Sequence, residues 1–212
     1  DQPAGVLARF DAQTNSPVRS VAVRPGLRRV IVSHGMVWLL GEIDGVLTRV
    51  DPQSSRAETD IIAGEPHKRG FLGALIGGDA GFYTGACVTH EAAFVADHRA
   101  NTGLFKFGQP EATIARVSLH DERAATPRPV GRWPMAPVEF GGWIWLTALN
   151  DRGRQGLVRI DSVTGHVAGE HPLPRDRPYF PTSSVTLVAG ETAMWAGSDG
   201  FLQRIEFVES GQ

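Results

Sequence analysis

The sequence predicts an all-β fold of repeated four-stranded units, and three observations lead to this prediction. A phrase with a central arginine recurs, an aromatic residue recurs upstream of it, and no window shows the 3.6-residue apolar period of an amphipathic helix. Glycine (25) and proline (14) fall between short apolar runs, where turns are needed. The copies of the phrase are VLARFDAQTN (6–15), VLTRVDPQSS (46–55), TIARVSLHDE (113–122), GLVRIDSVTG (156–165) and FLQRIEFVES (201–210).

The spacing of these copies indicates how many strands each unit holds. Their arginines, at positions 9, 49, 116, 159 and 204, are 40, 67, 43 and 45 residues apart. Upstream of the last four copies lies an apolar run with an aromatic residue, in GMVWLLG (35–41), EAAFVAD (91–97), GWIWLTA (142–148) and TAMWAGS (192–198). One further apolar run precedes this pair and another follows it. Four strands, here named A to D, at a period near 40 to 45 residues are typical of a β-propeller blade.

The arginine phrase is expected to form strand C, near 6–12, 46–51, 113–118, 156–161 and 201–207. Alternation along a strand places Leu47, Arg49 and Asp51 on one face. The arginine stem can lie along apolar surface while its guanidinium meets a carboxylate or carbonyl. The aspartate at the strand end can accept N–H groups of the following turn. Five copies of this phrase indicate a structural role, and the aromatic residues on strand B are expected to pack between blades.

Residues 1–212 are expected to form a single propeller domain or a propeller fragment, with four to five repeat units. There are five C strands, but only four copies of each of the other strands. Either four blades close and one C strand is surplus, or the chain is part of a larger propeller. The second interpretation is favoured, because an open propeller exposes sheet edges and an apolar blade face. A second polypeptide chain that completes or caps the propeller is therefore the expected partner.

Composition excludes several classes of protein. The formal net charge is −2 and the arginines are spread along the chain, so no basic stripe suited to nucleic acid is present. No apolar run approaches the roughly 20 residues that cross a membrane, and the first residues show no signal peptide. Cys87 is the only cysteine, which excludes an internal disulfide, and a small buried apolar role is expected for it.

The order of turn, VWL, DG hairpin, VLTRVDP and second turn resembles the virginiamycin B lyase-like and YVTN-type β-propeller repeats, over residues 6–207. The resemblance implies a bacterial extracytoplasmic protein, periplasmic or secreted. It also implies one of two activities: a binding or sensor module, or a metal-assisted lyase that uses His and Glu on the central face. No residue of this chain is assigned to the lyase's catalytic positions, and those lyases have seven blades.

Function is expected where the repeats differ, which is in the B to C connection at 98–112 and the D to A connections at 64–81 and 172–184. All three are predicted on one rim, which would be polar, cationic and aromatic. Such a rim suits an anionic or sugar-like ligand, or a partner with an acidic surface. The candidate binding residues are His67, Lys68, Arg69, His98, Arg99, Asn101, Lys106, Arg175, Asp176 and Tyr179.

The first functional hypothesis is a binding or assembly module that presents this rim to a protein partner or a small polar ligand, without catalysis. The alternative is a streptogramin-lyase-like lyase or hydrolase. Asp97, His98 and His67 could be metal ligands, but no tight ligand spacing supports such a site, and no cofactor is required by the sequence. SLHDE (118–122) is expected to form a polar turn on the opposite rim. The sequence does not specify a ligand, a partner or a reaction.

Overall fold

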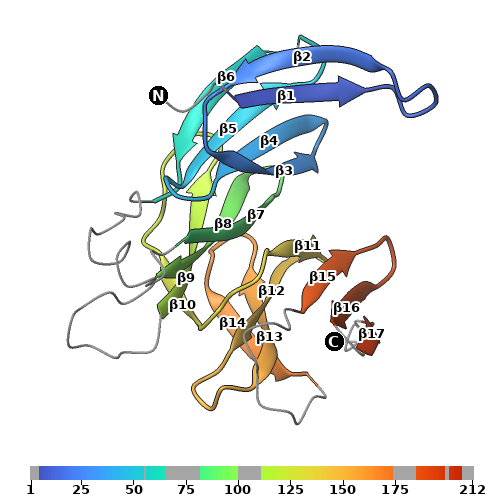
Figure 1. Ribbon diagram of the computed structural model, residues 1–212. Helices are drawn as coiled ribbons and strands as arrows, with labels where there is room; N and C mark the ends of the chain where they lie inside the picture. Colours follow the sequence, from blue (N-terminus) through green and yellow to red (C-terminus); the bar gives the residue numbers. More distant parts are fainter. Residues whose placement is uncertain are drawn as a thin grey trace, which may run out of the picture.

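The computed structural model describes residues 5–54, 56–64, 82–99, 111–173, 185–198 and 201–206 of the 212-residue chain. These residues form five antiparallel sheets that follow one another along the chain (Figure 1). None of them belongs to a helix that is long and apolar enough to cross a membrane.

Three of the sheets contain all four predicted strands, in the order A to D. The second sheet holds β3 (Leu27–Ser33), β4 (Met36–Gly41), β5 (Val46–Asp51) and β6 (Arg56–Ile62). The third holds β7 (Phe82–Val88), β8 (Ala92–Arg99), β9 (Glu111–Ser118) and β10 (Arg128–Gly131). The fourth holds β11 (Val138–Phe140), β12 (Trp143–Leu149), β13 (Gln155–Asp161) and β14 (Val167–Pro172).

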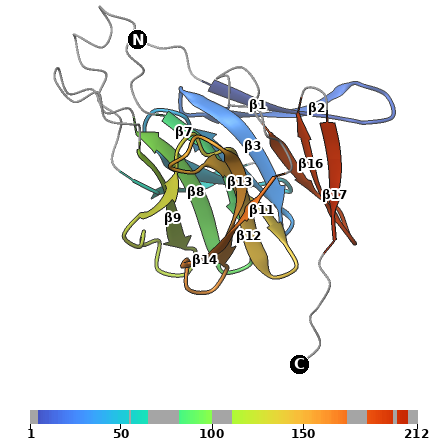
Figure 2. The ribbon, with the colours of Figure 1, turned by 90° about the horizontal axis from the view of Figure 1, so that it is seen from below.

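The sheets at the two ends are shorter. The first sheet holds β1 (Gly5–Phe10) and β2 (Pro17–Val23), which are strands C and D. The fifth holds β15 (Thr186–Ala189), β16 (Met194–Ser198) and β17 (Phe201–Ile205), which are strands A to C. The prediction of repeated four-stranded antiparallel units is thus confirmed. The described strands form an open arc and no closed sheet, with the A strands on its inner side (Figures 1 and 2).

The predicted C strands are confirmed to within two residues at each end. β1 stops at Phe10, short of the predicted residue 12, because Asp11 already belongs to the turn and its N–H donates to the carbonyl of Ser16. β17 ends at Ile205 instead of residue 207. β9 and β13 begin slightly earlier than predicted, at Glu111 and Gln155.

The two recurring features of the sequence are partners across neighbouring strands. The aromatic residue of strand B lies directly opposite the arginine of strand C in four sheets, so both side chains share one face. The pairs are Trp38 with Arg49, Phe94 with Arg116, Trp145 with Arg159 and Trp195 with Arg204. This face is called the front of each sheet, and the opposite face is called the back.

The core consists of three apolar layers, each between two consecutive sheets. Trp38 and Leu47 on the front of the second sheet pack with Val95 and Val117 on the back of the third. The same arrangement joins the third sheet to the fourth and the fourth to the fifth. The third, fourth and fifth sheets therefore each cover the front of the sheet before them, as predicted for the aromatic residues Trp38, Phe94 and Trp145 of strand B.

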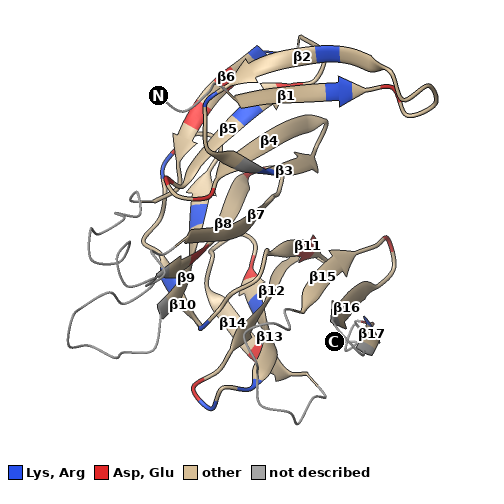
Figure 3. Ribbon diagram, in the orientation of Figure 1, with Lys and Arg blue, Asp and Glu red and all other residues tan. Residues whose placement is uncertain are grey.

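The repeated arginines support this packing with polar contacts. Arg49 forms an ion pair with Glu58 on β6, with 2.7 Å between Nε and Oε2. Arg9 donates to the carbonyl of Pro52 in the next sheet at 3.3 Å, and Arg159 lies 4.4 Å above the ring centre of Trp143. For Arg9 and Arg49 these contacts confirm a carbonyl or carboxylate partner, and Arg159 makes a cation–π contact instead. The charged side chains are spread over the strands (Figure 3).

The aspartates that end the C strands organise the C to D turns. Asp161 accepts the N–H groups of Val163 and Thr164 at 3.0 and 2.6 Å, and Asp51 accepts the N–H of Gln53 at 2.7 Å. The pKa of Asp161 lies below its usual value, mainly because the backbone N–H of Thr164 donates to the charged carboxylate. Asp11 and Asp51 also have lowered pKa values, mainly because backbone N–H groups of the turn donate to them. The predicted role of these residues in the turns is confirmed.

We expect Phe94→Ala to lower the free energy of unfolding by about 3–5 kcal/mol, because Phe94 is fully buried between the third and fourth sheets. Urea denaturation would measure the loss. The control is Val163→Ala in an exposed turn, where a change within about 0.5 kcal/mol is expected. Equal effects at the two positions would contradict the stacking of the sheets.

We expect acid to destabilise the protein through the aspartates of the C to D turns. Because the pKa of Asp161 is lowered by folding, its contribution is present above the unfolded value of about 3.9 and is lost as the pH falls through the folded value. Urea midpoints measured from about pH 6 down to about pH 2 should fall less steeply for Asp161→Asn than for the wild type. The matched control, Asp151→Asn, changes an aspartate outside the C to D turns; an equal flattening there would contradict this assignment.

Candidate functional site

Most of the predicted binding residues lie outside the described part of the chain. These are His67, Lys68, Arg69, Asn101, Lys106, Arg175, Asp176 and Tyr179. The predicted rim therefore stays a prediction. The two remaining candidates, His98 and Arg99, are the last residues of β8.

His98 lies in a strand and is buried, although the sequence predicts a loop at this position. The ladder between β8 and β9 continues through the pairs of His98 with Ala112 and Arg99 with Glu111, so the B to C connection begins after Arg99. The imidazole of His98 is 1% exposed and stacks on Trp133 at 4.1 Å between ring centres, with Phe82 at 5.2 Å. The expected loop boundary at His98 is wrong, because two more pairs extend the sheet.

A groove on the opposite rim, which we call the turn groove, brings together polar residues of the second and third sheets. It has a volume of about 580 Å³ and lies between the A to B turns of the two sheets and the C to D turn of the third sheet. Three of the seven histidines of the chain line it, and each comes from a different turn. The groove is lined by Ser33, His34, Met36, Trp38, Arg49, Val88, Thr89, His90, Glu91, Arg116, Ser118, Leu119 and His120.

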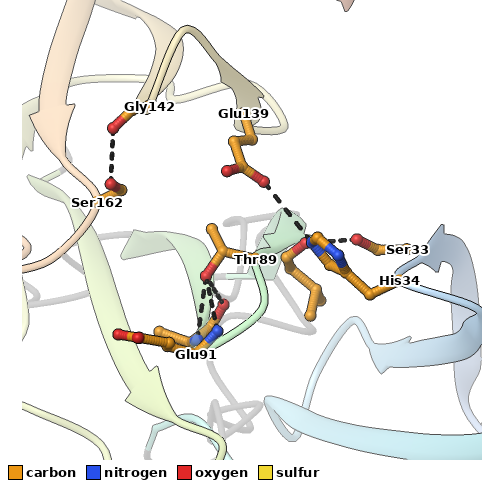
Figure 4. Close-up of polar contacts among 9 residues, drawn as sticks. Ser33, His34, Thr89, Glu91, Glu139, Gly142 and Ser162 are labelled. Atoms are coloured by element: carbon orange, nitrogen blue, oxygen red, sulfur yellow. Dashed lines mark hydrogen bonds and ion pairs between the residues drawn. The ribbon is translucent and has the colours of Figure 1, made fainter.

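His34 is placed by a tight A to B turn. His34 and Gly35 both have positive φ angles, of 49° and 74°, which is the conformation of a type I′ hairpin turn. The ring of His34 meets the ring of His90 edge to face, with centres 5.9 Å apart. Its Nε2 atom lies 4.0 Å from Oε2 of Glu139 on β11 (Figure 4). The A to B turns of the second and third sheets and strand β11 of the fourth sheet thus meet at His34.

Hydroxyl groups fix the turns that carry these imidazoles. Ser33 donates through Oγ to the carbonyl of Val88 at 2.6 Å, which joins β3 to β7 beside the groove (Figure 4). Thr89 donates to the carbonyl of Ala92 at 3.0 Å and accepts the N–H of Glu91 at 3.3 Å. Each hydrogen bond of this kind contributes about 1 kcal/mol and limits the positions that the turns can adopt.

The chemistry of the turn groove is that of hydrogen-bond donation. The guanidinium groups of Arg49 and Arg116 can only donate, and each imidazole can donate through at least one nitrogen. Among the described residues, Glu91 is the only carboxylate that lines the groove. Arg49 forms an ion pair with Glu58, and the buried Nε atoms of Arg49 and Arg116 both have no hydrogen-bond partner. The arrangement therefore suits a ligand that supplies acceptor oxygens.

The described residues show no arrangement for metal binding or for thiol catalysis. Within these residues, no group of three or more His, Cys, Asp or Glu side chains could hold a metal ion. Burial raises the pKa of the Cys87 thiol far above its usual value, and the charge of Glu139 adds to this effect. Cys87 is 8% exposed and packs in the apolar layer between the third and fourth sheets, as predicted.

The residues of this groove are far apart in the sequence. His34 and His90 lie in A to B turns, and His120 lies in a C to D turn. In a four-stranded antiparallel unit these two turns lie at the same end of the sheet. The signal was that the A to B turns of the second and third units carry histidine, where the fourth and fifth carry Gly141 and Gly190.

The fold and the groove define an all-β repeat protein with a polar site between two of its sheets. No protein-family model matches the sequence, and no curated protein matches it. Among solved structures, the chain is similar to hydrazine synthase of Kuenenia stuttgartiensis. The two are 13% identical, with a TM-score of 0.46, over 92% of this chain and 68% of that chain. A likeness of this size carries no information about the activity of the present chain.

Proposed function

We propose that the chain is a β-propeller module, closed or part of a larger ring, that binds a small anionic ligand in the turn groove. The repeated four-stranded sheets, stacked front to back with their A strands innermost, support a propeller as the architecture. In such a scaffold the repeated positions maintain the fold, and function belongs to positions at which the repeats differ.

The observation that carries this proposal is the gathering of His34, His90 and His120 in one groove. At the position of His120, the corresponding turns of the second and fourth sheets have Gln53 and Val163. The histidines are therefore not part of the repeat, and their packing does not explain them, because all three are exposed. Donor groups that converge on a groove of this size favour a ligand with carboxylate or phosphate oxygens.

The other functional hypotheses remain predictions. The lyase-like alternative and the loop-rich rim both involve residues outside the described ranges, His67 among them. An extracytoplasmic location rests on the resemblance of the repeats to virginiamycin B lyase-like propellers. Binding in the turn groove depends on neither of these hypotheses.

We expect inorganic phosphate and citrate, used as probes, to stabilise the protein against heat. A ligand present at about 100 times its Kd adds about 2.7 kcal/mol, which raises the Tm of a domain of this size by about 5–10 °C. Thermal unfolding followed by circular dichroism, with sodium chloride at matched ionic strength as the reference, would measure the rise. Absence of a rise with both probes would overturn the proposal.

The site is assigned by comparing two variants. His90→Ala with His120→Ala should abolish the rise in Tm, since two of the donors are removed from exposed turns without a change in the core. The matched control is His166→Ala, which removes an exposed imidazole from the C to D turn of the fourth sheet. A rise that persists in the double variant, or that disappears in the control, would place binding outside the turn groove.

A further inference from the structure

The internal interfaces of the protein show what normally covers each face of a sheet. On the front, strand C carries an apolar residue two positions before its arginine. In the second, third and fourth sheets this residue is Leu47, Ile114 or Leu157, with 0%, 2% and 4% of the side chain exposed. In each case the sheet that follows covers it. The same positions at the two ends of the protein can therefore be compared with internal references.

The front of the fifth sheet is uncovered. Leu202, at the position of Leu47, is 71% exposed. Trp195 is 38% exposed, whereas Trp38 and Trp145 at the same position are 3% and 1% exposed. Val188, which lies opposite Trp195 on β15, is also exposed. β15 and β16 contain no charged residue (Figure 3), and the one charged residue of β17, Arg204, is already paired with Glu206.

The back of the first sheet is uncovered in the same way. Arg9 points toward the second sheet, where it contacts Pro52, so Val6 and Phe10 face away from the protein. Val6 is 66% exposed and Phe10 is 55% exposed, whereas Val46 and Val50 at the same positions of β5 are 8% and 1% exposed. Val18 on β2 extends this apolar surface.

We infer that two copies of the chain associate head to tail, with the front of the fifth sheet of one copy against the back of the first sheet of the other. One chain carries both halves of the interface, and the internal layers show that such a front packs on such a back. The first and fifth sheets are the two ends of the open arc (Figure 1), and both faces carry exposed apolar residues. The contact would continue the existing stack of sheets and is independent of the turn groove.

This interface is heterologous, because the two copies contribute different surfaces. Repetition of the contact closes a ring of copies if the geometry allows, and otherwise gives an open chain of copies. Both would have masses that are multiples of the 22.9 kDa of one chain. A symmetric contact of two fifth sheets would use Leu202 but not Val6, and this difference makes the arrangement testable.

We expect native mass spectrometry and light scattering to show multiples of 22.9 kDa for the wild type at about 100 μM. Leu202→Asp and Val6→Asp should each weaken association by at least about 100-fold, because each buries an unpaired charge in the contact. Both positions are exposed in the single chain, so folding should be retained. Circular dichroism would confirm that both variants are folded.

Mixing the two variants provides the decisive test. Leu202→Asp retains an intact first sheet and Val6→Asp retains an intact fifth sheet, so the mixture should form a dimer through one restored contact. The control is Val163→Asp, which adds a charge at an exposed turn position away from both end faces and should leave association unchanged. A wild type that stays at 22.9 kDa would overturn the inference, as would an unaffected Val6→Asp variant or a mixture that stays monomeric.

Discussion

The packing of the front of one sheet on the back of the next is the interaction on which the rest of this protein depends. An antiparallel sheet of four short strands has two faces, and a single sheet cannot bury both of them. Trp38, Phe94 and Trp145 each provide a large apolar surface that only a following sheet can cover. The order of the sheets, their spacing along the chain and the placement of the turns all follow from this requirement.

The pairing of aromatic residue and arginine explains why both recur together. Strand B and strand C are neighbours, so the two side chains lie next to each other on the front. The aromatic ring fills the layer between sheets, while the arginine reaches the border of the layer. There it contacts Glu58, Pro52 or Trp143, depending on the sheet. The charged guanidinium group thus stays at the border of the layer, while the aliphatic part of the arginine side chain covers apolar surface.

The sequence was sufficient to predict the fold at the level of strands, because each strand is marked by a local signal. The arginine phrase and its aspartate located β5 to the residue, and the Gly and Pro clusters located the turns. The turn groove was harder to predict, because His34, His90 and His120 are separated by 56 and 30 positions along the chain. Only the three-dimensional stacking brings their turns to one place. The failure at His98 has a similar cause, since extension of β8 depends on its pairing with β9.

Comparison of equivalent positions in the repeats distinguishes two kinds of exposed residue. His34 and His90 are exposed at positions where other repeats have glycine, so their exposure reflects a difference in sequence. Trp195 and Leu202 are exposed although they match the buried residues of other sheets, because no described sheet packs on the front of the fifth sheet. Large apolar side chains that are buried in the other sheets lower the solubility of the protein when they are exposed to water. The turn groove and the end faces are therefore distinct surfaces, and loss of binding at one should leave binding at the other intact.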